Sequence, residues 1–390
     1  MTLVGAKVAM SANVSSRSDI IIRYGRIAFS SRARTQSVPK LNLSGFMILP
    51  GLVNAHDHLE FNLFPRLGRG PYPNAAAWAE DIFKPSQEPI ATQLRLPKPI
   101  RLWWGGLKNL LNGVTSVAHH NPYEPSVFRR CFPVRVLRRF GWAHSLAFSP
   151  DIAGCFRRTP SGAPFIIHAG EGTDFDSWRE LHRLEQAKVL RSFTVLVHGV
   201  AIRPEDLDLI RSRGASLVWC PSSNLFTLGR TVSPEVLKSD IPIALGTDSA
   251  LTAEGDLVDE LSVAANHVSA GRLYGMVTNE AARILHLKSG EGKIQDGGVA
   301  DLLVVRANDE NSPSRLLGSR PELVFLKGRL MLVSADAVRE LRMNNLEDFQ
   351  PLEIEGRGKW FVKGNVHEFL DATKQILGER ICLAGRRVIA

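Results

Sequence analysis

The residues best suited to chemistry are two histidines, His56 and His58, in the stretch ILPGLVNAHDHLE at 48–60. The apolar run from Ile48 to Val53 predicts a short buried strand, and the histidines follow it. In an extended chain, side chains two residues apart point to the same face, so both imidazoles can reach one metal ion. A closed metal site needs further donors from distant segments. Taken alone, the pair also fits surface or capping histidines.

Three further apolar runs end in a side chain that can bind a metal or accept a proton. PFIIH ends on His168, TVLVH ends on His198, and IPIALGTDS reaches Asp248. Core histidines usually lie in the middle of an element, so this recurrence favours a functional set. In a barrel of parallel strands, the carboxyl ends meet at one rim and the first and last strands are adjacent. His56, His58 and Asp248 would then meet, and His168 would face them.

Glu171 is the residue expected to select the reaction. It follows His168 in HAGEG, where Gly170 and Gly172 allow the backbone to turn and bring the carboxylate over a cavity. A carboxylate beside a metal-bound water can take its proton and pass it to a substrate. Metal binding lowers the pKa of water from 15.7 to about 7, which makes hydroxide available near neutral pH. The alternative is a surface acid paired with an arginine.

Other side chains could contact a substrate, and each also has a structural interpretation. These weaker candidates are Glu60, Trp78, His119, His120, Ser223 and Asn224. Glu60 could face the cavity or cap its loop. Adjacent residues of a strand point to opposite sides, so at most one of His119 and His120 can face inward. Ser223 and Asn224, in CPSSN, either orient the loop beside His198 or touch the substrate.

Five remaining histidines fall within helical or strand patterns, and we interpret them as structural. They are His144, His182, His267, His286 and His367.

The elements that must carry these residues alternate between strands and helices from about residue 50. Apolar runs predict strands at 48–54, 114–118, 134–137, 143–148, 164–168, 194–198, 215–220 and 241–247. Helical patterns lie at 177–190, 204–213 and 256–268. This alternation over about 240 residues predicts an α/β fold, and its length suits a closed (β/α)8 TIM-like barrel. An open α/β sheet is the alternative, and residues 138–164 leave little room for two full units.

Segments on both sides of this region predict a second, smaller domain. DIIIRYGRIAFSS at 19–31 predicts a hairpin that turns at Tyr24 and Gly25. The expected domains are a small β-sandwich with a C-terminal extension, 1–49 with 290–390, and a metal-dependent hydrolase barrel, 50–289. Within the extension, strands at 352–364 and 381–390 are expected around a helix at 365–377.

Composition narrows the class of protein. The chain has 390 residues, 44% of them apolar and 22% charged, which is ordinary for a soluble globular protein. Its net charge of +9 comes from scattered pairs such as Arg129–Arg130, Arg138–Arg139 and Arg157–Arg158, so we expect a solvated basic surface rather than nucleic-acid binding. The four cysteines form no CxxC, and no apolar run approaches 18 residues. We therefore expect a cytoplasmic protein without a membrane partner, and leave a homodimer open.

Taken together, the motifs resemble the amidohydrolase superfamily. They are HDH after PGLVNA, HAGE at 168–171, HG at 198–199, CPSSN at 220–224 and GTDS at 246–249. More narrowly, they resemble its branch of mononuclear-metal aminohydrolases and chlorohydrolases, which includes cytosine, guanine and adenosine-type deaminases and triazine hydrolases. The resemblance covers about residues 45–335 and includes GVADLLVV and LVFLKGRLMLV, similar to the closing strands of the family.

This resemblance implies one divalent metal ion, held by His56, His58, His168 and Asp248. Binuclear relatives bridge two metals with a lysine from the fourth strand, and residues 121–166 contain no lysine. His198 would lie beside the metal-bound water as a base, with Glu171 and Asp248 completing the catalytic set. The ligands suit Zn²⁺, and Fe²⁺ occurs in relatives. In the family, the segment that contains Trp78 builds a lid over the substrate, although aromatics are more often core residues.

The expected function is hydrolytic deamination of a small nitrogen heterocycle of the purine, pyrimidine, pterin or triazine type. Glu171 would protonate the ring nitrogen, hydroxide would add, and ammonia would leave. The chain lacks the H-x-E and PCxxC signature of the smaller zinc deaminase fold. The alternatives are hydrolysis of a cyclic amide or imidazolone, or dechlorination of a triazine, on the same metal site. A non-catalytic binding protein of this fold would be expected to have lost metal ligands.

Overall fold

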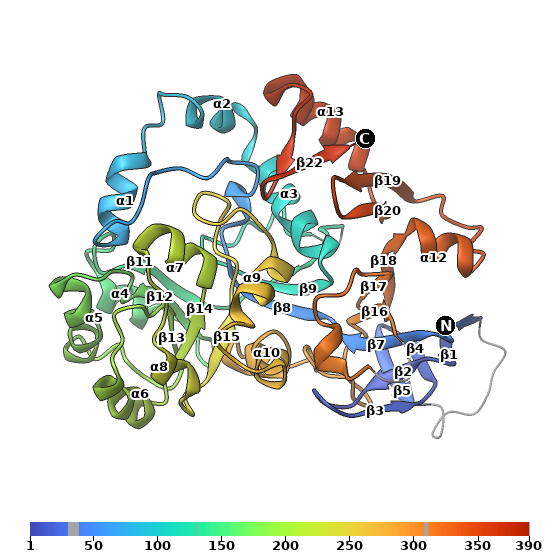
Figure 1. Cartoon of the computed structure of the whole chain (residues 1–390), viewed down its shortest axis with the longest axis horizontal. Coiled ribbons are helices and arrows are strands. Elements are labelled where there is room, and N and C mark those ends of the chain that lie inside the picture. Colours follow the sequence, from blue (N-terminus) through green and yellow to red (C-terminus); the bar gives the residue numbers. More distant parts are fainter. Residues whose placement is uncertain (30–38, 130, 308–310, 390) are drawn as a thin grey trace.

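A computed structural model describes residues 1–29, 39–129, 131–307 and 311–389. Strands and helices alternate through the middle of the chain, and strands from both termini lie together beside them (Figure 1). Ser30 and Ser31 of the predicted hairpin, and Arg130 of a predicted arginine pair, lie outside the described residues.

Parallel strands form two sheets in the middle of the chain, with orders β10-β9-β8 and β11-β12-β13-β14-β15. Their bounds are β8 (Leu52–Asp57), β9 (Val114–His119), β10 (Arg135–Val136), β11 (Gly141–Ser145), β12 (Phe165–Ala169), β13 (Thr194–His198), β14 (Ser216–Trp219) and β15 (Ile243–Leu245). A parallel bridge between Asp57 and Asp248 brings the ends of β8 and β15 together. Between the described residues of β10 and β11 we find no strand pairing. The predicted α/β class is confirmed, and closure of the barrel stays a prediction.

The predicted strand at 48–54 is wrong in its boundaries, because it is two strands in different sheets. β7 (Phe46–Pro50) belongs to a sheet of terminal strands, and β8 begins after Gly51. A Cβ atom on Gly51 would lie 2.3 Å from the hydroxyl oxygen of Thr115, so glycine allows the chain to pass this close to β9. As a result His56 lies inside β8 rather than after a strand.

Helices pack around the parallel strands and on the loops that follow them. They are η2 (Leu59–Phe61), α1 (Ala75–Ile82), α2 (Ile90–Arg95), α3 (Lys98–Leu111), α4 (Ile152–Arg157), α5 (Phe175–Gln186), η3 (Pro204–Asp206), α6 (Leu207–Arg213), α7 (Pro221–Leu228), α8 (Pro234–Lys238), α9 (Leu257–Ala264), α10 (Ala270–Met276) and α11 (Asn279–Ile284). The three predicted helices correspond to α5, to η3 with α6, and to α9. Side-chain caps start two of them: Asp174 accepts from the Ser177 amide, and Asp256 accepts from the Val258 and Asp259 amides.

The third and fourth strand units are short, as the sequence indicates. The third strand, β10, contains two residues, and the helix that follows β11 is α4, with six residues.

Strands from both ends of the chain form the remaining sheets, with orders β21-β22-β19-β20-β18-β17-β16-β7-β2-β3 and β5-β4-β1-β6. Their bounds are β1 (Thr2–Val4), β2 (Lys7–Ala9), β3 (Ser15–Arg17), β4 (Ile20–Arg23), β5 (Arg26–Phe29), β6 (Lys40–Asn42), β16 (Leu302–Arg306), β17 (Leu323–Leu326), β18 (Arg329–Ser334), β19 (Phe349–Ile354), β20 (Gly358–Lys363), β21 (Cys382–Leu383) and β22 (Arg386–Ile389). The β4–β5 hairpin turns at Tyr24 and Gly25, as predicted. Leu3 and Ile20 of one sheet share a buried core with Ile48 and Phe325 of the other.

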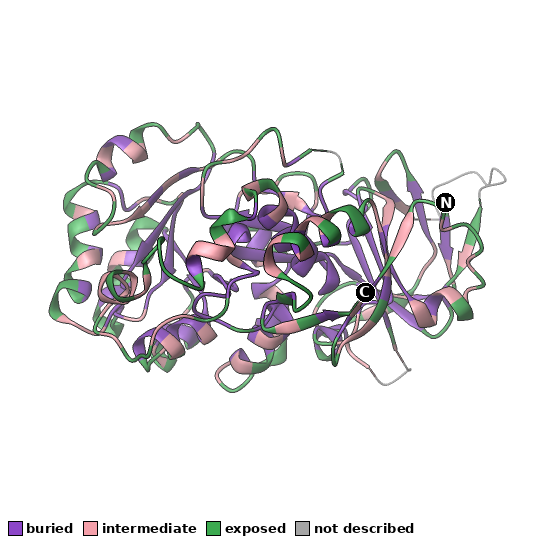
Figure 2. Ribbon diagram, turned by 90° about the horizontal axis from the view of Figure 1, so that it is seen from above, coloured by how far each residue is buried: buried purple, intermediate pink, exposed green. Residues whose placement is uncertain are grey.

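The C-terminal extension packs against the parallel-strand region. It contains α12 (Ala335–Glu340) and α13 (Val366–Leu377), after η4 (Pro313–Leu316). The Phe369 ring of α13 stacks on Trp103 of α3 with centroids 4.3 Å apart, and the Trp104 indole donates to the Thr373 hydroxyl. Burial is continuous along the parallel strands and into this extension (Figure 2). No helix among the described residues is long and apolar enough to cross a bilayer.

Candidate active site

The five strongest candidates from the sequence lie together at the carboxyl ends of the parallel strands. His56 and His58 come from β8 and the residue after it, His168 from β12, His198 from β13, and Asp248 from the turn after β15. None of them is more than 7% exposed. Burying polar side chains without hydrogen-bond partners costs free energy. We therefore ask which contacts within the site stabilise these four histidines and one aspartate.

The backbone is strained where two of these side chains leave their strands. The φ angles are 77° at His198 and 55° at Asp248, in the left-handed region that residues with a Cβ rarely adopt. Gly246 allows β15 to approach β8, because a Cβ atom there would lie 2.7 Å from the Cβ of His56. The carbonyl of His56 then accepts from the amides of Thr247 and Asp248, at 2.9 and 3.1 Å. These contacts fix Asp248 beside the histidine pair.

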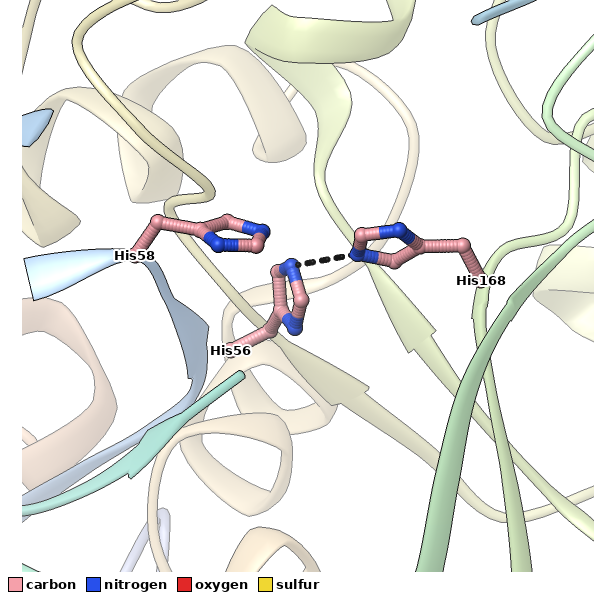
Figure 3. Close-up of side chains that lie close together, drawn as sticks. All are labelled: His56, His58 and His168. Atoms are coloured by element: carbon pink, nitrogen blue, oxygen red, sulfur yellow. Dashed lines mark hydrogen bonds between the residues drawn. The ribbon is translucent and has the colours of Figure 1, made fainter. Parts of the chain in front are cut away.

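Three imidazoles and one carboxylate converge on a small volume. His56 and His58 approach from one side and His168 from the other (Figure 3). The Nε2 atoms of His56 and His168 are 3.1 Å apart, and Asp248 Oδ1 lies 3.8 Å from His56 Nε2 and 3.6 Å from His58 Nε2. Donors about 2.0–2.1 Å from a tetrahedral zinc ion lie about 3.4 Å from one another. The donor spacing therefore fits a divalent cation.

The ionisation of the imidazoles also fits a cation. Burial, with the neighbouring His120 next in effect, lowers the pKa of His56 and of His168, so both rings are neutral near pH 7 and keep lone pairs. The Nδ1 atoms of His56, His58 and His168 have no hydrogen-bond partner among the described residues. The Nε2 atoms of these rings face the other donors, so a cation would bind at Nε2 and would leave Nδ1 as the ring nitrogen without a partner among the described residues.

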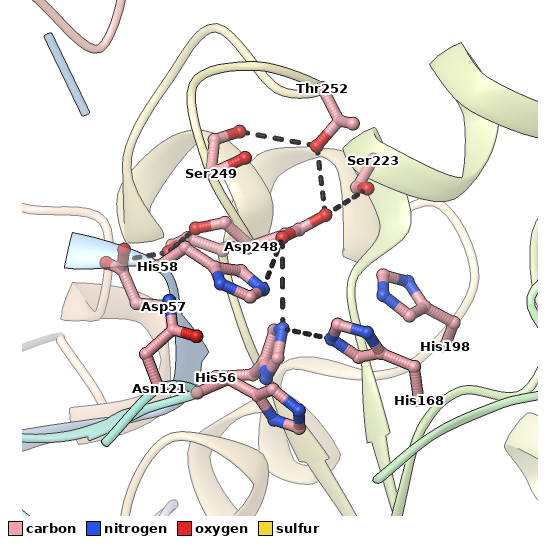
Figure 4. A network of polar contacts seen from close by, with 12 residues as sticks. His56, Asp57, His58, Asn121, His168, His198, Ser223, Asp248, Ser249 and Thr252 are labelled. Atoms are coloured by element: carbon pink, nitrogen blue, oxygen red, sulfur yellow. Dashed lines mark hydrogen bonds and ion pairs between the residues drawn. The ribbon is translucent and has the colours of Figure 1, made fainter. Parts of the chain in front are cut away.

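Asp248 is held by hydroxyl groups on the side away from the imidazoles (Figure 4). Its Oδ2 accepts from Ser223 Oγ at 2.6 Å and from Thr252 Oγ1 at 2.9 Å. Burial would raise the pKa of Asp248, but His198, His58 and the hydroxyl donors outweigh burial and lower it. The carboxylate is therefore charged, with Oδ1 directed at the histidines.

His198 and Glu171 form a second pair beside the cluster. Asn224 Oδ1 accepts from His198 Nδ1 at 2.8 Å, and the Asn224 amide donates to the His198 carbonyl at 3.4 Å. The proton on Nδ1 leaves a lone pair on Nε2, which lies 3.4 Å from Glu171 Oε1. Burial first, and then Asp248 and Glu180, raise the pKa of Glu171 well above its usual value. Glu171 is therefore suited to holding a proton.

A cavity of about 330 Å³ opens beside this pair. Its lining includes Asn74, His144, Phe148, His168 and Glu171. This volume is within the usual range for small-molecule sites. The cavity gives a ligand access to Glu171 and His168 together.

Glu180, on α5, also lines the cavity and holds the turn before Glu171. Its Oε2 accepts from the Gly170 amide at 2.6 Å. Burial raises the pKa of Glu180 to about 7.

Two histidines extend the site beyond the strongest candidates. His120 stacks on His168 with centroids 4.3 Å apart, and its Nε2 lies 3.1 Å from the Ala143 carbonyl. The ring of His144 is 4.8 Å from that of His168 and lines the cavity. His144, interpreted from the sequence as structural, therefore lies at the candidate site. Its place at the end of β11 is the same signal that marks His168 and His198.

His119 and Glu60 contact each other and the loop that follows β8. His119 Nδ1 accepts from the Leu59 amide at 3.3 Å, and its Nε2 is 3.6 Å from Glu60 Oε2. Glu60 Oε1 accepts from the Asn121 amide at 2.7 Å. Of the adjacent pair, therefore, only His120 faces the histidine cluster, and the contacts of Glu60 support its loop interpretation.

Trp78 does not line the cavity. It packs beside Phe64 and Leu67, and its indole donates to the Leu67 carbonyl at 3.0 Å. The contacts of Ser223 with Asp248 and of Asn224 with His198 support their orienting role over direct contact with substrate. His182, His267, His286 and His367 are not in the cavity lining.

Helix α7 carries both Ser223 and Asn224, and a buried acid holds its first turn. Glu260 of α9 is 2% exposed, and its Oε2 accepts from the Ser222 amide at 3.1 Å. Burial raises the pKa of Glu260 to about 8. No motif in the sequence marks Glu260.

Comparisons with known proteins agree with this arrangement. Residues 161–331 match the model of the amidohydrolase family. A 5-methylthioadenosine/S-adenosylhomocysteine deaminase from Pyrococcus furiosus is 29% identical over 82% of this chain and 92% of its own length.

Two solved structures have a similar fold. An adenosine deaminase from Xanthomonas campestris with bound zinc has a TM-score of 0.68 and 18% identity, over 87% of this chain and 96% of its own. An atrazine chlorohydrolase from Arthrobacter aurescens with zinc has a TM-score of 0.66 and 17% identity, over 88% and 98%. The chain is therefore similar in sequence and in fold to enzymes of the amidohydrolase superfamily.

Proposed function

We propose that this protein is a metal-dependent aminohydrolase that removes the amino group of a purine-type heterocycle as ammonia. The observation that carries the proposal is the pairing of Glu171 with His198, whose Oε1 and Nε2 atoms are 3.4 Å apart beside the histidine cluster. The matched family and the deaminase relative support hydrolysis of a carbon–nitrogen bond.

The metal part of the proposal is one zinc ion per chain, held by His56, His58, His168 and Asp248. The donor spacing supports this set, and the similar adenosine deaminase and chlorohydrolase structures contain zinc. Residues 121–166 contain no lysine that could bridge a second ion. Iron(II) suits the same donors and is the alternative. When bound, the ion supplies an activated water for attack on the ring carbon that carries the amino group.

The protein side of the reaction is a proton transfer by Glu171. Its carboxylate takes the proton of the attacking water and delivers it to the adjacent ring nitrogen, and a second proton leaves with the amino group as ammonia. The raised pKa of Glu171 allows it to hold that proton between the two steps. His198, fixed by Asn224, presents an unprotonated Nε2 to the same space and orients the attacking water.

The substrate proposed is a purine base or nucleoside with an amino group on the ring. The named activity of the Pyrococcus relative supports this class, and the cavity that contains His144, Phe148 and Glu171 provides the space. Dechlorination of a triazine is the second candidate, because of the fold similarity to atrazine chlorohydrolase. A proton carrier such as Glu171, which lines the cavity beside His198, favours deamination.

The proposal includes an architecture and a setting. We propose that the eight parallel strands close into a (β/α)8 barrel over 50–289, with a β-sandwich domain made of 1–49 and 290–390. The bridge between Asp57 and Asp248, and the core shared by the two terminal sheets, support this arrangement. Cytoplasmic location, the absence of nucleic-acid and membrane partners, and a homodimer stay predictions.

Ammonia release tests the function directly. Metal-stripped and zinc-reconstituted protein would be incubated with adenosine, 5-methylthioadenosine, guanine, cytosine, a pterin and a chlorotriazine, with assays for ammonia and for chloride. We expect ammonia from an aminopurine compound and only with zinc. Chloride release without ammonia would instead support the triazine hydrolase candidate, and neither product from fully zinc-loaded protein would contradict both.

A further inference from the structure

A buried carboxylate lies between the two histidines of the cluster and points away from them. Asp57 is fully buried, and both of its oxygens are occupied by donors. Oδ1 accepts from the Asn62 amide at 2.8 Å. Oδ2 accepts from the Asn109 amide at 2.8 Å, the Thr247 hydroxyl at 3.1 Å and the Asn54 amide at 3.2 Å. With these contacts made, Asp57 has no oxygen free for a metal or a substrate.

A buried lysine supplies the opposite charge. Lys108, on α3, is 3% exposed, and its Nζ lies 2.9 Å from Asp57 Oδ2. Nζ also donates to Asn62 Oδ1 at 2.7 Å and to the Thr247 hydroxyl at 3.3 Å. Three acceptors satisfy the three protons of an ammonium group. The pair is therefore both neutralised and fully hydrogen-bonded, which a buried ion pair requires.

This polar cluster ties together the segments that carry three of the proposed metal ligands. Asp57 separates His56 from His58, and Thr247 directly precedes Asp248. Asn62 follows η2 on the same loop, and its carbonyl accepts from the Ala384 amide of the C-terminal extension at 3.0 Å. Any shift of Asp57 would therefore move both flanking histidines and the strand end that carries Asp248.

We propose that Asp57 and Lys108 are positioning residues that hold His56, His58 and Asp248 at the spacing a single divalent cation requires. The proposal rests on the metal site of the proposed function, and it assigns a role to two residues that neither bind the ion nor contact the substrate. A charged pair specifies this geometry because each partner is costly to bury alone, and only one arrangement satisfies both.

An ion pair with a buried carboxylate, at the opposite end of β8, provides a matched control. Asp301 is 1% exposed, pairs with Arg135 and accepts from the Lys327 amide at 2.8 Å. Its carbonyl accepts from the amide of Gly51, just before β8 begins, at 2.9 Å. The variant Asp301→Asn removes a buried charge from the same strand system but not from the end that carries the histidines.

The first test measures zinc affinity on metal-stripped protein, together with the visible spectrum of the cobalt-substituted form. For Asp57→Asn we expect the zinc dissociation constant to rise by about 10-fold to 100-fold, the usual effect of losing an outer-shell partner, and the cobalt spectrum to change. Asp301→Asn should lower thermal stability while leaving both metal readouts unchanged. Wild-type affinity and spectrum in folded Asp57→Asn protein would overturn the proposal.

A second pair of variants covers the case in which Asp57→Asn does not fold. Lys108→Met with Asp57→Asn removes both charges together and fills the space of the lysine with an apolar side chain of similar length. We expect this double variant to fold and to bind zinc more weakly than the wild type. The single variant Lys108→Arg keeps the positive charge, so its zinc affinity should lie between those of the wild type and the double variant. Wild-type zinc affinity in the double variant would overturn the proposal. Failure of the wild-type protein to bind zinc would instead contradict the proposed function.

Discussion

The two ends of strand β8 are held by different kinds of contact. At its start, Gly51 donates to Asp301, whose carboxylate is paired with Arg135 and with the Lys327 amide. At its end, His56 and His58 are buried with Nδ1 atoms that lack partners among the described residues. The polar groups at the start of β8 therefore have hydrogen-bond partners, whereas the Nδ1 atoms at its end have none among the described residues.

This difference indicates that the start of β8 serves stability and that its end serves function. Buried polar groups in proteins almost always find partners, as Asp301 does, so those that do not need a different explanation. In a barrel of parallel strands, the architecture proposed for this region, the start of the strands contributes stability and the carboxyl end carries the chemistry. The strained backbone at His198 and Asp248 lies at the same carboxyl end. The carboxyl ends of the parallel strands therefore carry strained backbone and unpartnered ring nitrogens, whereas the start of β8 carries a paired carboxylate.

The largest effect should come from removing a ligand at the rim. We expect His168→Ala and His56→Ala to lose bound metal and to reduce turnover to the background rate, because each removes one of four donors. Elemental analysis and an ammonia assay on the same sample would measure both. Full metal occupancy in both variants would show that the ligand set is wrong, and two tightly held ions in the wild type would contradict a single-metal site.

The next largest effect should come from the proton carrier. Glu171→Gln keeps the size of the side chain and its hydrogen bonding, but it cannot carry a proton. We expect turnover to fall by about 10² to 10⁴-fold with metal retained. A near wild-type rate on an identified substrate would favour a hydrolysis that needs no ring-nitrogen proton. Loss of metal would make Glu171 a ligand and reopen the assignment of Asp248.

Much of the rim could be predicted because it follows from local pattern. Apolar runs that end in His168 and His198 indicate both a strand and its polar end, and parallel strands bring such ends together. The hairpin at Tyr24 and the helix at 365–377 were equally local signals. Gly51 gave no such signal. A glycine is required there because the side chain of Thr115, which is distant in sequence, leaves no space for a Cβ atom.

The supporting residues could not be predicted in the same way. Lys108 lies in a helix of mostly apolar residues, where a lysine usually marks the solvent face, and its partner Asp57 is on a strand distant in sequence. Glu260, on α9, contacts α7 by accepting a hydrogen bond from the backbone amide of Ser222. His144 lies near the end of β11, which ends at Ser145. The strand predicted at 143–148 ends three residues later, so His144 did not stand at its end. These roles depend on pairs of segments that only the folded chain brings together.

A smaller effect should come from the helix that orients His198. Asn224→Ala removes the acceptor for His198 Nδ1, so the ring loses its fixed tautomer. We expect turnover to fall by about 10-fold to 100-fold with metal retained. Thr227 provides the control, because it is buried on the same helix and its hydroxyl has no partner among the described residues. Thr227→Val should keep wild-type turnover, and equal losses in both variants would indicate a general disturbance of α7.

The smallest effect on catalysis is expected at Glu260. Its burial should instead change how the free energy of unfolding depends on pH. Burial raises its pKa to about 8, so the folded protein holds a proton that the unfolded chain has lost above its ordinary pKa of about 4.3. The free energy of unfolding should therefore fall as pH rises from about 4.3 to about 8, by about 1.4 kcal/mol per pH unit at most. Glu260→Gln keeps the acceptor for Ser222 and removes this titration. Urea unfolding at low and high pH should show a smaller loss of stability in Glu260→Gln than in the wild type, and equal losses would mean that Glu260 ionises without cost.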